Sequence, residues 1–358
     1  MRALLWTLGL LLPLTGSAAD SWAPAKRLDA WFDQLAKEQR VNGSIAISEK
    51  GWLRYQRSVG FARIENGVPQ PGDAGTRYRI GPVSRIFTAA LTMQVVEKAS
   101  ITLDSPVAEF YPDLPNALAI TYRDLLQERS GLADYFDAAD FPAWHTQPRT
   151  HEQMLAAITA GGVKFAPRER VEPSNSNYLL LGYVLEKVQG RSYDDILRRG
   201  IDKLGLARTY FAGTQRSTLE SIAYRESPEG WIAIDASDPT VLGGAAGVLS
   251  NAGDLVKFMD ALFAEKLLSA QSLATLRGTE GAPRVALQSQ EIAGQAAEGL
   301  QGSAGGFSAA VYYFPARQLS ISFTGNASAV PAIQIVEQAL TTVIRRGYKP
   351  RKSRRQDD

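Results

Sequence analysis

The sequence predicts a mixed α/β fold, in which an antiparallel sheet is flanked by N- and C-terminal helices and interrupted by an all-helical insertion. Three observations support this. A helical pattern near the start is followed by strand-like runs, the long middle part alternates helical runs with Pro- and Gly-rich loops, and the end returns to strands and a helix. We therefore expect both ends of the chain to build one domain, with a ligand cleft between it and the insertion.

The first part of the α/β domain is predicted to contain a helix, two strands and a second helix. Residues 24–38 carry apolar side chains at helical spacing, after a proline suited to a helix start. Residues 44–60 predict two strands joined by a turn at 49–51. From Val83 to about Lys98, apolar residues recur at intervals of three and four, which predicts a buried helix.

The remaining elements follow the same reasoning. Clear helical runs within the insertion cover residues 178–188, 193–199 and 252–263. Two strands are then predicted over 306–315 and 318–325, and a final helix over 332–345. The resulting domain boundaries are 20–100 with 280–346 for the α/β domain, and 101–279 for the helical insertion.

The N-terminus has the three parts of a secretory signal: a basic Arg2, an apolar run, and small residues ending at Ala19. The apolar run is shorter than the roughly 20 residues that cross a bilayer, and Pro13 interrupts it. We therefore expect residues 1–19 to be a signal peptide, cleaved after Ala19. The chain contains no cysteine and so no disulfide, which suits export to a bacterial periplasm.

The C-terminal end is basic, with seven basic and two acidic residues from Arg345 onward. We expect residues 347–358 to form a disordered, solvated tail. The alternative is a weak contact of Arg345–Arg355 with anionic lipid or cell-wall polymer. With no cysteine and two histidines, no metal site is expected, and no pattern indicates another cofactor, a nucleotide or a nucleic acid.

Five ordered segments carry a resemblance to a known family. They are YRIGPVSRIFTAAL, ITLDSPVAEFYPDLPNALAITYRDLLQERSGL, SNSNYLLLGYVLEKVQGRSYDDIL, GGAAGVLSNAGDLVKFMDALF and GSAGGFSAAVYYFPARQLSISFTGN. In these segments the chain resembles the serine β-lactamase and penicillin-binding protein superfamily, in its branch of class C β-lactamases, D-peptidases and esterases. The resemblance covers nearly the whole mature chain and implies the same α/β architecture with an inserted helical domain.

The resemblance also implies where catalytic groups would lie, and this chain departs from the family there. The family's first motif is Ser-x-x-Lys, and the matching positions are Pro82 and Arg85. Proline has neither a hydroxyl nor the backbone N–H that serves the family's oxyanion hole; losing one such donor costs on the order of 3 kcal/mol of transition-state stabilisation. Arginine stays charged and cannot act as a base.

The other two motifs are also altered. The family's Tyr-x-Asn motif falls on Pro173, Ser174 and Asn175, so the resemblance implies that the amide survives and the phenol is lost. The third motif has a Lys or His, a small polar residue and a glycine. It is matched here by Leu300, Gln301 and Gly302, which retain the glycine and replace the cation with an apolar side chain.

These departures lead to two hypotheses. The first is an exported, catalytically inactive protein that binds a cell-wall peptide or a partner protein in the family cleft. Its candidate cleft residues are Ser84, Arg85, Ser174, Asn175, Gln301 and Ser303. Arg85 would either bind a carboxylate such as a peptide C-terminus or form a structural ion pair.

The second hypothesis is an active esterase, D-peptidase or β-lactamase that uses Ser84 or another serine in an altered constellation. The two histidines, His145 and His151, fall in a Pro-rich loop and at the start of the next helix. For both of them we expect surface or capping roles rather than a place in a catalytic triad.

Overall fold

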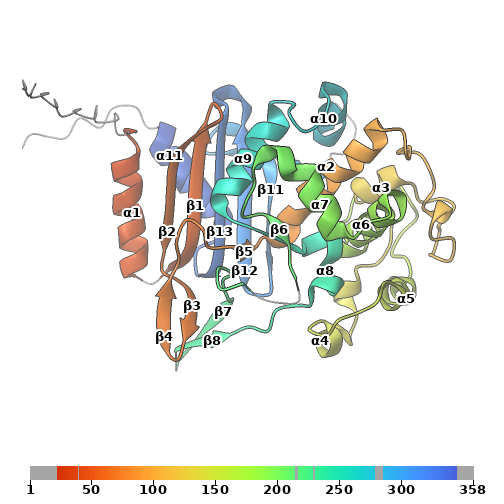
Figure 1. Ribbon diagram of the computed structural model, residues 1–358, viewed down its shortest axis with the longest axis horizontal. Helices are drawn as coiled ribbons and strands as arrows, with labels where there is room; N and C mark the ends of the chain where they lie inside the picture. The colour runs from red at the N-terminus through yellow and green to blue at the C-terminus, as the bar shows by residue number, and fades with distance from the viewer. Residues whose placement is uncertain (1–21, 39, 214–216, 229, 279–284, 345–358) are drawn as a thin grey trace, which may run out of the picture.

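The computed structural model describes residues 22–38, 40–213, 217–228, 230–278 and 285–344 (Figure 1). The expected signal peptide with its cleavage site and the basic tail lie outside these residues. No helix in the described part of the chain is both long and apolar enough to cross a bilayer.

A six-stranded antiparallel sheet joins the two ends of the chain. Its strand order is β10-β11-β12-β13-β1-β2. The strands are β1 (Val41–Glu49), β2 (Trp52–Val59), β10 (Gln288–Ile292), β11 (Gln295–Ala304), β12 (Phe307–Phe314) and β13 (Leu319–Ser328). Because the N-terminal β1 pairs with the C-terminal β13, the complete sheet forms only when both ends of the chain meet. The predicted mixed α/β fold with an antiparallel sheet built from both ends of the chain is confirmed.

Two helices cover one face of this sheet (Figure 1). They are α1 (Ala25–Lys37) and α11 (Ala332–Ile344), which agree within one or two residues with the helices predicted at the two ends. Leu28 and Phe32 of α1 are buried in one cluster with Ile335 of α11 and with Ile45 and Ile321 of the sheet. Burial of such apolar side chains contributes about 1.5–3 kcal/mol each, so this cluster fixes the helices on the sheet.

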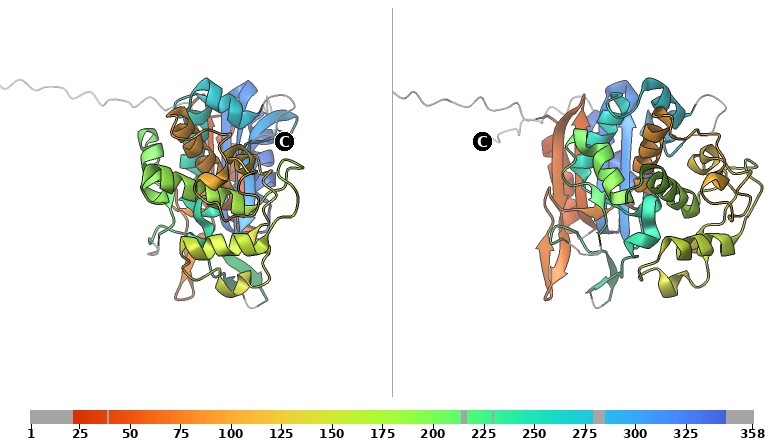
Figure 2. Two further views of the ribbon diagram at one scale, coloured as in Figure 1. Left: turned by 90° about the vertical axis from the view of Figure 1, so that its right-hand side faces the viewer. Right: turned by 45° about the vertical axis from the view of Figure 1, so that its right-hand side comes forward.

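The opposite face of the sheet is covered by α9 (Ala252–Phe263), which packs against β1 and β13. Ala252 and Val256 of this helix contact Ala46 of β1. Beside it lies α2 (Ser84–Glu97), between the sheet and the helical part (Figure 2). Most of its side chains are buried. The sheet is therefore sandwiched between helices, and α2 occupies the junction.

The helical part extends from this junction. Its helices are α3 (Tyr122–Leu126), α4 (Phe141–Trp144), α5 (His151–Gly161), α6 (Asn175–Gln189), α7 (Tyr193–Ile201), α8 (Pro239–Ala246) and α10 (Ala270–Arg277). Short 3-10 turns connect the elements: η1 (Gly81–Val83), η2 (Val107–Glu109), η3 (Tyr135–Asp137), η4 (Asp202–Leu204) and η5 (Pro315–Arg317).

The expectation that residues 101–279 are all-helical is wrong. Four strands also lie there: β6 (Tyr210–Phe211), β7 (Tyr224–Ser227), β8 (Gly230–Ala233) and β9 (Val248–Ser250). β9 pairs with β5 (Tyr78–Arg79), while β3 (Phe61–Glu65) and β4 (Val68–Pro71) form a separate hairpin. Strands of two to four residues are too short to show a period of two, and the helical pattern of α9 does not reveal that the helix packs on the sheet.

Candidate functional site

The start of α2 is built by a sharp turn after β5. Gly81 has φ +51°, a conformation that side chains with a Cβ rarely adopt, and Pro82 follows it in the turn η1. The α-helix itself begins at Ser84, one residue after the predicted start. Proline fits here because the first turn of a helix leaves its N–H groups without intrahelical partners. The replacement at position 82 therefore leaves the helix start intact.

Pro82 packs directly against the edge of β11. A Cβ atom built on Gly302 would lie only 2.4 Å from Cγ of Pro82, so the glycine is required for this close approach. Leu300, Gly302 and Ala304 alternate onto the same face of the strand, and Ala304 lies against Gly81. The proline ring thus fills the space between the helix start and the strand.

Gln301 and Ser303 do not belong to the cleft, which corrects the expectation for both. Successive side chains of a strand lie on opposite faces, and cross-strand partners share a face. Gly302 pairs with Ala309, which is buried in the cluster under the helical part. Gln301 instead pairs with Ala310, which is buried under α1 and α11. Gln301 and Ser303 therefore lie on the far face of the sheet.

Arg85 is locked in a buried ion pair. Its Nη1 donates to Oε1 of Glu128 at 2.6 Å and its Nη2 donates to Oδ1 of Asn175 at 2.9 Å. The side chains of Arg85 and Glu128 are only 11% and 13% exposed, and the guanidinium lies 5.4 Å from the ring centre of Tyr178. Of the two hypotheses for Arg85, the structural ion pair agrees with this geometry. A ligand carboxylate would have to compete with the buried carboxylate of Glu128 for the charge of Arg85.

Glu128 is held from three sides. Its Oε2 accepts hydrogen bonds from the backbone N–H of Ser174 at 3.0 Å and from Nδ2 of Asn177 at 2.6 Å. Burial raises the pKa of Glu128, and the charge of Arg85 and the hydrogen bond from Asn177 oppose that rise. The backbone of Glu128 has φ +56°, which costs about 1 kcal/mol or more for a non-glycine residue. The surrounding contacts outweigh that strain and keep the carboxylate on Arg85.

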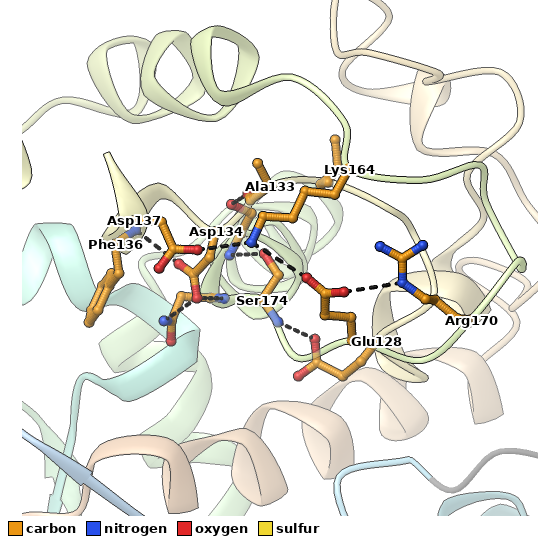
Figure 3. A network of polar contacts seen from close by, with 12 residues as sticks. Glu128, Ala133, Asp134, Phe136, Asp137, Lys164, Arg170 and Ser174 are labelled. Carbon is orange, nitrogen blue, oxygen red and sulfur yellow. Dashed lines mark hydrogen bonds and ion pairs between the residues drawn. The ribbon is translucent and has the colours of Figure 1, made fainter. Parts of the chain in front are cut away.

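Ser174 and Asn175 are used to hold the start of α6 (Figure 3). Ser174 is buried and caps the helix, because its side chain accepts from the N–H of Ser176 at 3.3 Å. Asn175 donates from both its backbone N–H and its Nδ2 to Oδ2 of Asp134, at 3.0 and 2.7 Å. With its Oδ1 occupied by Arg85, the amide of Asn175 is satisfied within the protein.

The polar network continues outward to solvent (Figure 3). Nζ of Lys164 lies 2.9 Å from Oδ2 of Asp137 and 3.4 Å from Oε1 of Glu172, and Nε of Arg170 lies 3.2 Å from Oε2 of Glu172. These side chains are more than a third exposed, so each pair contributes about 1 kcal/mol or less. On this side of the cleft, the cations Lys164 and Arg170 are therefore each paired with an acid, Asp137 or Glu172.

A cavity of about 430 Å³ opens beside the ion pair. Its walls contain three of the positions where the chain departs from the family, namely Arg85, Pro173 and Leu300. The other lining residues are Gln127, Glu128, Val171, Tyr178, Ala286, Leu287, Gln288, Ser289 and Gln290. Tyr178 does not replace the lost phenol. It is buried, its hydroxyl donates to the carbonyl of Leu126 at 2.8 Å, and burial raises its pKa well above the ordinary value.

Ser84 does not reach the cleft, which corrects its assignment as a cleft residue. It has no exposed surface, and its Oγ accepts a hydrogen bond from the backbone N–H of Val248 at 3.2 Å. Its position after the turn η1 directs the side chain into the core beneath β9. A serine at this depth cannot attack a bound ligand.

The two histidines lie apart from the cavity walls. Nε2 of His151 is 3.2 Å from Oε2 of Glu186, and its ring stacks on Tyr183. Nδ1 of His145 is 3.0 Å from Oγ of Ser237, which is a serine–histidine contact that the sequence did not suggest. Within the described ranges, no group of three histidines or acids could hold a metal ion.

Sequence reasoning missed three residues of the site: Glu128, Asp134 and Asn177. The available signal was physical rather than a motif, since a buried arginine in place of the lysine requires a buried carboxylate. Glu128 is the acid that interrupts the segment LLQERSGL, which is otherwise rich in buried residues. Sequence alone could nominate it as the partner of Arg85, but not locate it.

Comparisons with known proteins place this geometry in a family. The family model described as Beta-lactamase matches residues 28–336. The teichoic acid D-alanine hydrolase of Staphylococcus aureus is 28% identical over 185 residues, which cover 51% of this chain and 44% of that protein. The matched part is thus less than half of the relative's length.

Solved structures share the fold. The D-amino acid amidase from Ochrobactrum anthropi SV3 has a TM-score of 0.79 at 20% identity, covering 89% of this chain and 97% of that one. The octameric penicillin-binding protein homologue from Pyrococcus abyssi has a TM-score of 0.76 at 24% identity, with coverages of 88% and 76%. At such identities these structures support the fold alone. The family match over most of the chain's length shows that it belongs to the beta-lactamase family.

Proposed function

We propose that this protein is an exported, non-catalytic member of the family, which binds a cell-wall peptide in the cleft without forming an acyl-enzyme. The observation that carries the proposal is the state of the first motif. Pro82 stands at the nucleophile position, and Arg85 at the base position is locked onto Glu128 at 2.6 Å.

The chemistry of these two residues supports the proposal. Pro82 offers no hydroxyl to attack a carbonyl and no N–H to stabilise an oxyanion. Arg85 keeps its proton at every accessible pH and is further held by a buried carboxylate. Pro173 removes the family's phenol, and the hydroxyl of Tyr178, the tyrosine that lines the cavity, is bonded to the carbonyl of Leu126.

The cavity favours an uncharged ligand group. Each terminal nitrogen of Arg85 donates one hydrogen bond within the protein, and its Nε is buried without a hydrogen-bond partner among the described residues. The charge of Glu128 is matched by Arg85, and the other lining residues are uncharged. Because relatives are named for D-alanine and D-amino acid substrates, the proposed ligand is a peptide whose D-amino acid side chain and amide enter the cavity. A free carboxylate would find no available cation there.

The alternative is an active hydrolase with a different constellation. The observation in its favour is the contact between His145 and Ser237, whose Nδ1 and Oγ are 3.0 Å apart. The ring of His145 is stacked on Phe141, and the ring's other nitrogen has no hydrogen-bond partner among the described residues. The pair therefore lacks the third group that orients the base in a catalytic triad.

Covalent labelling distinguishes the non-catalytic protein from the active hydrolase. The purified protein is incubated with a fluorophosphonate and with a labelled penicillin, and its intact mass is measured. We expect no stoichiometric adduct. A single adduct that disappears in Ser237→Ala would establish the alternative, and an adduct on any other serine would also overturn the proposal.

Ligand binding is tested by calorimetry with N-acetyl-D-alanyl-D-alanine amide. Val171→Trp places a bulky group at the exposed wall of the cavity, and Val163→Trp is the matched control at an exposed valine that does not line it. We expect the Val171 variant to lose binding and the Val163 variant to retain it. Equal affinities, or no binding by the unaltered protein, would contradict the proposed ligand.

A further inference from the structure

A second concave surface lies at the other end of α2. Two adjoining cavities of about 540 and 380 Å³ share Lys203, Leu204 and Lys266 in their walls. Their walls include residues of the β1–β2 turn and of the C-terminal halves of α2, α7 and α9. Since α2 has 14 residues, its length separates this lysine groove from Pro82 by roughly 20 Å.

The lysine groove carries an excess of positive charge. Its exposed lysines are Lys50, Lys98, Lys203, Lys257 and Lys266. In the described part of the chain, none of the five has an ion-pair partner. Arg199 also lines the smaller cavity but is bound to Asp195 at 2.8 Å.

Two acids line the same two cavities, and each accepts a hydrogen bond from the protein. Oδ1 of Asp260 accepts from Oγ of Ser320 at 2.6 Å, and Oε1 of Glu97 accepts from the backbone N–H of Ser269 at 2.7 Å. Burial raises the pKa of Asp260. Five lysines against two acids leave the walls of the groove cationic.

The fold places these lysines independently of one another. Lys50 and Gly51 have φ +55° and +79° and form the two-residue turn between β1 and β2, which holds Lys50 at the rim. Lys98 follows the last turn of α2, where the negative end of the helix dipole stabilises a cation. That effect does not account for Lys50, which lies in a turn between strands, or for Lys257, which lies in the middle of α9. Their convergence therefore requires another reason.

We propose that the lysine groove binds a linear polyanion that carries phosphate groups. Phosphate oxygens accept charge-assisted hydrogen bonds from lysine ammonium groups, and several lysines along one groove match a ligand with repeated charges. The stacked rings of Phe263 and Tyr313, with centres 4.1 Å apart, supply an apolar wall for the atoms between phosphates. The lysines line concave cavities, so a narrow chain reaches them more readily than the flat surface of a bilayer does.

The test compares two double variants that remove the same charge. Lys203→Gln/Lys266→Gln removes the lysines shared by both cavities, whereas Lys26→Gln/Lys37→Gln removes two exposed lysines of α1 on the far side of the sheet. Binding of linear polyphosphate is measured by calorimetry at several salt concentrations. We expect the groove variant to bind roughly three- to tenfold more weakly and to show a shallower salt dependence, with the α1 variant unchanged.

Each outcome decides the proposal. Equal losses in the two variants would mean that net charge or the basic tail is responsible, and would overturn it. Absence of polyphosphate binding by the unaltered protein would do the same. Binding to phosphatidylglycerol vesicles that depends on Lys203 and Lys266, without binding to polyphosphate, would replace the polyanion by a lipid surface. The four lysines are exposed, so we expect their substitution to leave the thermal unfolding temperature unchanged. An unchanged temperature shows that both variants are folded.

Discussion

The cleft and the lysine groove lie at opposite ends of α2 and differ in the environment of their cations, which is buried and paired in the cleft but, in the part of the chain that the structure describes, exposed and unpaired in the groove. In the cleft, Arg85 is almost completely buried and is matched by Glu128. In the groove, five lysines are exposed and have no ion-pair partner within the described residues. A buried cation without a partner carries a large desolvation cost, whereas an exposed one is stabilised by water. The cation of the cleft therefore maintains the fold, and those of the groove remain available to a ligand.

The largest expected effect comes from breaking the buried pair. Glu128→Gln leaves the guanidinium of Arg85 buried without a counter-charge, which we expect to lower the free energy of unfolding by about 3–5 kcal/mol. The measurement is denaturant unfolding. Asp104→Asn is the control, because it breaks the more exposed pair with Arg123 and should cost about 1 kcal/mol or less. If the two variants were destabilised equally, the contrast between buried and exposed charge would be wrong.

A smaller effect is expected at the contact between the start of α2 and strand β11. Gly302→Ala places a methyl group 2.4 Å from Cγ of Pro82, and we expect this overpacking to destabilise the protein by about 1–3 kcal/mol. In Gly302→Ala/Pro82→Ala the ring is removed and much of the loss should be recovered. A single variant as stable as the unaltered protein would show that Pro82 does not fill the space beside β11.

The smallest effect concerns pH. In Arg85→Met, Glu128 loses the charge that lowers its pKa, so its folded-state pKa rises further above the unfolded value. The folded protein then binds the proton more tightly than the unfolded chain, and stability is gained as the pH falls through the folded-state pKa. We expect the deficit of this variant to shrink by about 1 kcal/mol between neutral and mildly acidic pH. Arg85→Met/Glu128→Gln should lack this change, and a deficit that grows on acidification would contradict the assignment.

Much of the fold could be predicted because the apolar periodicities are strong. The helices at both ends and the strands β1, β2, β12 and β13 follow from them directly, whereas β10 and β11 were not predicted. The packing of α9 on the sheet and the short strands β6–β9 could not be predicted, since no local pattern distinguishes them. These features depend on tertiary contacts made after the chain has folded back on itself.

The candidate site likewise has features that the sequence could predict and features that it could not. Side chains alternate between the two faces of a strand, so Gln301 lies on the other face from Leu300 and Gly302. The sequence alone could therefore have excluded Gln301 from the cleft. The pairing of Arg85 with Glu128 joins residues 43 positions apart, and only the structure locates it. The motif positions were identifiable from the sequence, whereas the contacts that now occupy them were not.

The most direct test of the central claim is an intact-mass comparison of the unaltered protein with restored variants, after exposure to a labelled penicillin. We expect no adduct on the unaltered protein and none on Pro82→Ser/Arg85→Lys/Pro173→Tyr, because Glu128 would keep the new lysine protonated. Adding Glu128→Gln to this variant should permit slow acylation at position 82. Stoichiometric acylation of the unaltered protein would contradict the account.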